Sequence, residues 1–186
     1  MPSFIYLQPD LTIAEMPVKL LPMKQILITT FGALVSFALI AQTDTKLPAR
    51  LEQLAKRIEP KVIEWRRHFH QYPELSNREK NTAAKIAEHL KSLGIEVQTG
   101  IAHTGVVGLL RGGKPGPVIA LRADMDALPV TERNSLPFAS KVKAVFNDQE
   151  VGVMHACGHD THMAILMGVA EILASMRNDL KGTVKF

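Results

Sequence analysis

The segment His155–His162 concentrates side chains that bind metal ions. It reads His-Ala-Cys-Gly-His-Asp-Thr-His and holds three of the chain's seven histidines and its only cysteine. Thiolate and imidazole are donors that suit zinc and related divalent ions. The glycine between Cys157 and His159 lets the backbone bend, so that both side chains can converge. This pattern predicts a metal site with Cys157 and His159 as ligands.

Each of these residues also has a plainer interpretation. Cys157 could be a small buried hydrophobic residue, or the nucleophile of a Cys–His pair. Neighbours on one loop rarely hold a base against a nucleophile, so we rank metal binding higher. Asp160 could cap the next helix or hydrogen-bond a ligating imidazole. His162, taken alone, is more typical of a packed or surface histidine.

Two aspartates, Asp124 and Asp126, follow an apolar run upstream of this segment. Burying two like charges this close is costly unless a cation or hydrogen bonds offset it. In open α/β sheets, sites form at the carboxyl ends of strands. A turn with an aspartate cap is the commoner explanation for such a pair on its own.

Alternating helices and strands are expected to position these residues. Apolar residues recur at helical spacing from Leu51 to Phe69, and Pro60 predicts a kink or a fresh helix start within that run. Ser76 and Glu79 form a capping box that should open a second helix, closed by Gly94. A third helix is expected over about 161–176, and strands over 95–98, 106–110, 118–123 and from 183, with a turn over 112–116.

The strand expected over 118–123 is nearly continuously apolar, which is typical of a strand buried on both faces. Together with the alternation of elements, this predicts an α/β fold with a largely parallel sheet flanked by helices. The composition is that of a globular domain: 46% hydrophobic and 22% charged residues in 186. The net charge of +4 comes from scattered basic residues, so we expect no nucleic-acid partner. A single cysteine excludes an intrachain disulfide.

Residues 1–45 differ from the remainder. An uncharged apolar run, 26–40, follows Met23-Lys24 and precedes small and polar residues. This layout favours an export signal, with a mature chain that begins near Gln42. The run is shorter than the ~20 residues of a membrane anchor, although an anchor or a buried helix is the alternative. The first 22 residues fit no signal pattern, so Met23 could be the true start. Residues 46–186 would then form the exported, periplasmic or secreted part.

The segments 122–129 and 155–162 together resemble the binuclear-metal amidohydrolases of the aminoacylase and carboxypeptidase superfamily. The branch is that of hippurate hydrolase and the indole-acetyl-amino-acid hydrolases. The motif Trp65–Ser76, the patch Leu136–Ser140 and the tripeptide Gly152–Met154 also match the family's pattern. The resemblance extends over about Leu54–Phe186.

The resemblance implies a hydrolase that cuts the amide bond of N-acyl amino acids or small peptides. Two divalent metal ions would share a bridging water; zinc or manganese is expected, with cobalt and nickel as alternatives. Cys157 and His159 match metal ligands, and Asp126 matches a catalytic aspartate that orients the metal site. Asp124 stands where the wider superfamily has a metal-binding histidine, and we do not assign it as a ligand.

The resemblance also implies that this chain is the N-terminal part of a zinc-peptidase-like catalytic domain. The family's general base belongs to a Glu-Glu pair, which is expected after Phe186. Further metal ligands and a lid domain that forms homodimers are expected after Phe186 as well. We therefore expect the reading frame to continue and the present chain to be inactive alone. Two alternatives are a module that binds metal or ligand without turnover, and a thiol hydrolase that uses Cys157.

Overall fold

The computed structural model describes residues 46–186, so the export signal and the start sites expected within residues 1–45 lie outside the described residues. The described helices are α2 (Lys46–Gln71), α3 (Lys80–Ser92), α4 (His159–Ser175) and the short 3-10 helix η1 (Arg177–Asp179). None of these described helices has the length and apolar character that a membrane span requires.

The main sheet contains β1 (Glu96–Ile101), β2 (Gly105–Arg111), β3 (Lys114–Ala120) and β6 (Lys181–Lys185) in the order β1-β2-β6-β3. The β1–β2 and β2–β6 pairs are antiparallel, and the β3–β6 pair is parallel. A separate hairpin consists of β4 (Lys143–Phe146) and β5 (Gln149–Gly152). The α/β class is therefore confirmed, but the described sheet is mixed rather than largely parallel.

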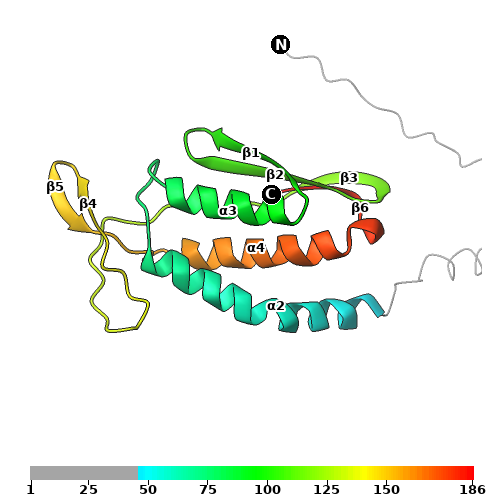
Figure 1. The fold of residues 1–186 in the computed structure, drawn as a ribbon, viewed down its shortest axis with the longest axis horizontal. Coiled ribbons are helices and arrows are strands. Elements are labelled where there is room, and N and C mark those ends of the chain that lie inside the picture. Colours follow the sequence, from blue (N-terminus) through cyan, green and yellow to red (C-terminus); the bar gives the residue numbers. More distant parts are fainter. Residues whose placement is uncertain (1–45) are drawn as a thin grey trace, which may run out of the picture. The chain divides into compact units, whose positions relative to one another are not determined.

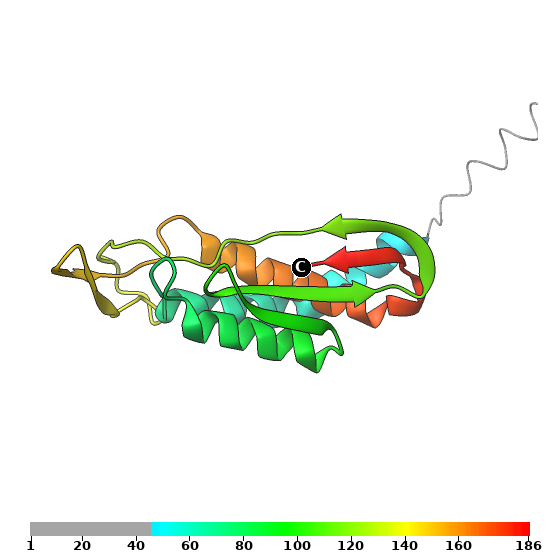
Figure 2. The ribbon, with the colours of Figure 1, turned by 90° about the horizontal axis from the view of Figure 1, so that it is seen from above.

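The elements are stacked in layers (Figures 1 and 2). The sheet lies on α3 and α4, and α2 packs against α4 on the side away from the sheet. One core cluster joins Leu90 of α3, Leu110 of β2 and Ala170 of α4 between sheet and helices. A second joins Phe69 of α2 to Met163 and Met167 of α4. These clusters fix the start of α4 relative to the end of α2.

Helix α2 passes through Pro60 as one continuous helix, so of the two outcomes expected from the sequence, a kink or a fresh start, the fresh start is excluded. A proline inside a helix removes one backbone hydrogen bond, at a cost of about 3 kcal/mol. Packing against α4 offsets this cost: Ile58 and Phe69 are buried there. The approach is close, because a Cβ added at Gly168 of α4 would lie 2.8 Å from Cγ2 of Val62.

Helix α3 is not opened by the expected capping box. Glu74 supplies the cap instead, because its carboxylate accepts hydrogen bonds from the backbone N–H groups of Asn81 and Thr82, at 3.1 and 2.8 Å. Glu79 accepts a hydrogen bond from Thr104 Oγ1 at 2.6 Å and makes no side-chain cap. The end of α3 matches the prediction, with Gly94 at φ +68°.

Strand β3 is exposed along its length, so the expected burial on both faces is wrong for the described structure. Val118 and Ile119 are 69% and 54% exposed. The strand lies at the end of the sheet order and pairs with β6 alone among the described strands (Figure 2). An apolar run alone does not distinguish an edge strand from a central one.

Candidate metal centre

The turn before α4 presents Cys157 at the surface. Gly158 follows it with φ +91°, a left-handed conformation that favours glycine, and occupies the N-cap position of α4. Nothing lies within 4 Å of a Cβ built at Gly158, so the glycine meets a conformational need rather than a lack of space. The thiol of Cys157 is exposed, so its interpretation as a buried hydrophobic residue is wrong.

His159 begins α4 and is held by Asp126. Its Nδ1 lies 2.9 Å from the backbone carbonyl oxygen of Asp126 and 3.1 Å from Oδ1 of the same residue. A carbonyl oxygen can only accept, so Nδ1 carries a proton, and in the neutral imidazole Nε2 then keeps the lone pair. This is the tautomer that a metal-ligating histidine needs, fixed by a backbone carbonyl and a carboxylate. The structure thus brings Asp126 and His159 together from 33 residues apart.

Asp124 lies outside this contact. Nε and Nη2 of Arg122 donate to its Oδ1, at 3.0 and 2.6 Å. The hydrogen bonds from Arg122 are the main reason why the pKa of Asp124 is lowered. His162, one turn after His159, is exposed, and the centroids of the two rings are 6.0 Å apart.

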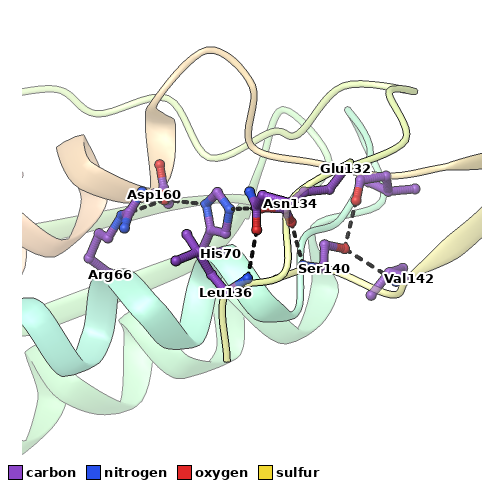
Figure 3. A network of polar contacts seen from close by, with 9 residues as sticks. Arg66, His70, Glu132, Asn134, Leu136, Ser140, Val142 and Asp160 are labelled. Atoms are coloured by element: carbon purple, nitrogen blue, oxygen red, sulfur yellow. Dashed lines mark hydrogen bonds and ion pairs between the residues drawn. The ribbon is translucent and has the colours of Figure 1, made fainter. Parts of the chain in front are cut away.

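Asp160 does not cap α4, and the imidazole that it contacts is that of His70 rather than that of the proposed ligand His159. It lies in the first turn, 1% exposed, and Oδ2 accepts hydrogen bonds from Arg66 Nε and His70 Nδ1, at 2.9 and 2.8 Å (Figure 3). On the other side of the His70 ring, Nε2 lies 2.9 Å from Oε1 of Glu132. Sequence reasoning missed Arg66, His70 and Glu132 as parts of the site.

Glu132 is itself surrounded by donors. Burial raises the pKa of its carboxyl, but hydrogen bonds from His70, the backbone N–H of Ser140 and the amide of Asn134 outweigh burial and lower the pKa below its ordinary value. The carboxylate form is therefore the stable one in the folded chain. It holds the loop after Asp126 against the end of α2 (Figure 3).

His155 is buried beside these groups without a hydrogen-bond partner in the described part of the chain. It is 4% exposed, and both ring nitrogens are unpartnered there, as is Oδ1 of Asp160. Burial lowers the pKa of His155 to about 4, although the Asp160 carboxylate opposes this shift. The imidazole is thus neutral near pH 7.

Cys157 and His159 suit a metal ion as donors, but they are only part of a coordination sphere. Zinc takes four ligands, and among residues 46–186 no three His, Cys, Asp or Glu side chains are grouped closely enough to hold a metal ion. The fit rests on the exposed thiol and on the tautomer of His159.

Comparison with known proteins places these segments in context. Residues 120–186 match the profile described as peptidase family M20/M25/M40. Thermostable carboxypeptidase 1 of Saccharolobus solfataricus is 49% identical over 140 residues, which are 75% of this chain and 34% of that protein. The N-acyl-L-amino acid amidohydrolase of Geobacillus stearothermophilus is 44% identical over 136 residues, 73% of this chain and 35% of that protein.

Solved structures agree with these sequence matches. The Bacillus subtilis YXEP protein, described as a dinuclear metal binding peptidase from the M20 family, superposes with a TM-score of 0.62 at 45% identity. The match covers 70% of this chain and 35% of that structure. The chain spans about a third of the length of the curated relatives it matches.

Proposed function

Because this chain belongs to peptidase family M20/M25/M40, we propose that it forms part of a metal-dependent hydrolase for the amide bond of N-acyl amino acids or small peptides. The observation that carries the proposal is the contact of His159 Nδ1 with Asp126, beside the exposed thiol of Cys157. Relatives named as an N-acyl-L-amino acid amidohydrolase and an N-acetyl-L-cysteine deacetylase support this substrate class.

Cys157 and His159 would hold metal, and the name of the dinuclear neighbour supports two ions. From the donor types and the family resemblance we propose zinc or manganese, with cobalt and nickel as alternatives. When bound, such ions acidify a water molecule and polarise the amide carbonyl. Cys157 would bind as the thiolate and His159 through Nε2. Asp126 keeps the imidazole oriented and its Nδ1 protonated. It acts as an orienting group and need not carry a proton itself.

The general base is not among the residues that we assign. The family resemblance places that base in a pair of adjacent glutamates, and the 186 residues contain no such pair. We therefore propose that residues 1–186 alone bind metal without turning over substrate. Homodimer formation through a lid domain is proposed from the same resemblance.

Titration of the chain with Co²⁺ tests the metal site, because Cys157 is the sole thiol and a thiolate-to-cobalt absorption band can arise only from it. We expect Cys157→Ser to abolish the band and to weaken binding, since a hydroxyl is a hard and poorly ionised donor. Asp126→Asn should retain the band with an altered spectrum. His162→Ala is the matched control and should behave as the parent. A Cys157→Ser variant that binds as tightly as the parent would show that Cys157 is not a ligand.

A thiol hydrolase makes a different prediction. In a polypeptide of the relatives' full length, a chelator should abolish amide hydrolysis and added metal should restore it. Part of the activity lost in Cys157→Ser should return with excess metal, whereas Asp126→Asn should not be rescued. Activity that survives chelation but is lost on alkylation of Cys157 would favour the nucleophile instead.

We also propose that residues 1–45 direct export, on the basis of the apolar run 26–40 after Met23-Lys24. Expression in a bacterial host followed by fractionation tests this. Protein from the periplasm or medium should have a new N-terminus near Gln42. Full-length protein with an intact N-terminus in the cytosol would contradict export.

A further inference from the structure

We propose that His70 is a positioning residue for the metal centre, which fixes the Cys157–His159 segment through Asp160 and the Asp126 segment through Glu132. This inference rests on the metal site proposed above and assigns a role to residues outside the donor set. It starts from an arrangement in which one imidazole joins two buried carboxylates from different parts of the chain (Figure 3).

The contacts on the two sides of the His70 ring are short and are buried from solvent. Nδ1 of His70 is 2.8 Å from Asp160 Oδ2, and Nε2 is 2.9 Å from Glu132 Oε1. The side chains of His70, Asp160 and Glu132 are 5%, 1% and 0% exposed. Each nitrogen–oxygen contact needs a proton between its atoms, and an unpaired buried carboxylate is costly. Arg66 contributes a cation to the same oxygen of Asp160 at 2.9 Å.

Both carboxylates are close in sequence to the metal centre. Asp160 directly follows His159 in the first turn of α4, so its anchorage on α2 limits how that turn can rotate. Glu132 lies in the loop that continues from Asp126, and it also accepts a hydrogen bond from the backbone N–H of Ser140. Since Asp126 holds the His159 ring, both segments of the centre are tied to His70.

The imidazole ring of His70 presents its two nitrogens on opposite sides, one toward each carboxylate. Glutamine offers an amide of similar reach, but it cannot donate in two opposite directions to two carboxylates. His70→Gln should therefore release one segment while it preserves most of the packing volume. Partners that orient metal ligands typically change metal affinity by about 10–100-fold when they are lost.

The test is Co²⁺ titration of the full chain, read by the Cys157 thiolate-to-cobalt band and the visible d–d spectrum, with thermal unfolding measured in parallel. We expect His70→Gln to weaken Co²⁺ affinity about tenfold and to change the d–d spectrum at temperatures where the variant is folded. The matched control is His89→Gln: His89 of α3 also bonds α4, through the Met167 carbonyl at 3.2 Å. It should lower thermal stability without changing affinity or spectrum.

A second variant, Glu132→Gln, decides the matter if His70→Gln does not fold. Its amide keeps the size of the side chain but can accept from either His70 or the backbone N–H of Ser140, not from both, so one of these contacts is lost and we expect weaker Co²⁺ binding with a retained fold. Parent-like affinity and spectrum in a folded His70→Gln or Glu132→Gln protein would overturn the inference but leave the metal site standing. A parent chain that shows no Cys157-dependent band would overturn both proposals.

Discussion

Among single side chains, the pair of Trp65 and His89 provides a measurable pH response. Their ring centroids are 4.7 Å apart, and Trp65 is the chain's only tryptophan. Burial is the main reason why the pKa of His89 is lowered from 6.5, although its hydrogen bond to Met167 opposes the shift. We expect tryptophan fluorescence to fall on acidification with a midpoint below pH 6.5, because an imidazolium quenches indole.

The same shift has a consequence for stability. A histidine whose pKa is lowered by folding binds its proton more readily in the unfolded chain, so the free energy of unfolding should fall as pH drops from 6.5 through the pKa of folded His89. His89→Gln should remove both the fluorescence transition and this part of the pH dependence. A fluorescence midpoint at or above pH 6.5 in the parent would contradict the assignment.

The residues of the centre were predictable to different degrees. Cys157 and His159 are recognisable as candidates because their side-chain types and spacing already suit a metal ion. Asp126 is a candidate only through the family resemblance, because an aspartate pair after an apolar run is more often part of a turn. His70 and Glu132 gave no such signal, because the contacts of His70 are with residues far along the chain. Asp160 is 90 residues and Glu132 is 62 residues away in sequence. The only hint in the sequence was that Arg66 and His70 lie four residues apart, on one side of an amphipathic helix. A helical pattern alone assigns both of these polar residues to the surface.

Between helices, the contact of Gly168 with Val62 determines how closely α2 and α4 approach. A Cβ at Gly168 would lie 2.8 Å from Cγ2 of Val62, and a β-branched side chain in a helix has little rotamer freedom to yield. We expect Gly168→Ala to destabilise the parent by about 1–3 kcal/mol. In a Val62→Ala background, the same change should instead stabilise by up to about 1 kcal/mol, through helix propensity.

Urea unfolding of the two single variants and the double variant measures this reversal of sign. Stabilisation of the parent by Gly168→Ala would show that the helices separate easily.

The elements themselves were largely predictable from periodicity, but their ends and burial were not. The span of α3 and its end at Gly94 follow from local pattern and backbone conformation. Its cap from Glu74 depends on a turn between helices, and the passage of α2 through Pro60 depends on packing against α4. The exposure of β3 depends on strand order, which no local pattern contains.

Across the whole described unit, two ion pairs that each join residues more than 90 apart in sequence should differ in their contribution to stability. Arg50 bonds Asp179 at 2.9 Å, but both side chains are about half exposed, at 50% and 54%. Arg66 bonds the buried Asp160 at the same distance. We expect Arg50→Ala to change the free energy of unfolding by no more than about 0.5 kcal/mol. Arg66→Ala should cost about 2 kcal/mol or more, because it leaves a buried carboxylate short of a partner.

Chemical denaturation of both variants, with the parent as reference, makes the comparison. A larger loss in Arg50→Ala than in Arg66→Ala would contradict it.

The bridge that His70 makes between Asp160 and Glu132 also bears on the order in which the chain folds. Its two contacts close loops of 90 and 62 residues, and chain entropy must be lost before such distant contacts are gained. Helices and hairpins can form earlier from local contacts, so we expect the His70 bridge to form after the transition state for folding. Loss of His70 should therefore speed unfolding more than it slows folding. The segments of the proposed metal centre should then come together last and be the first to separate when the fold opens.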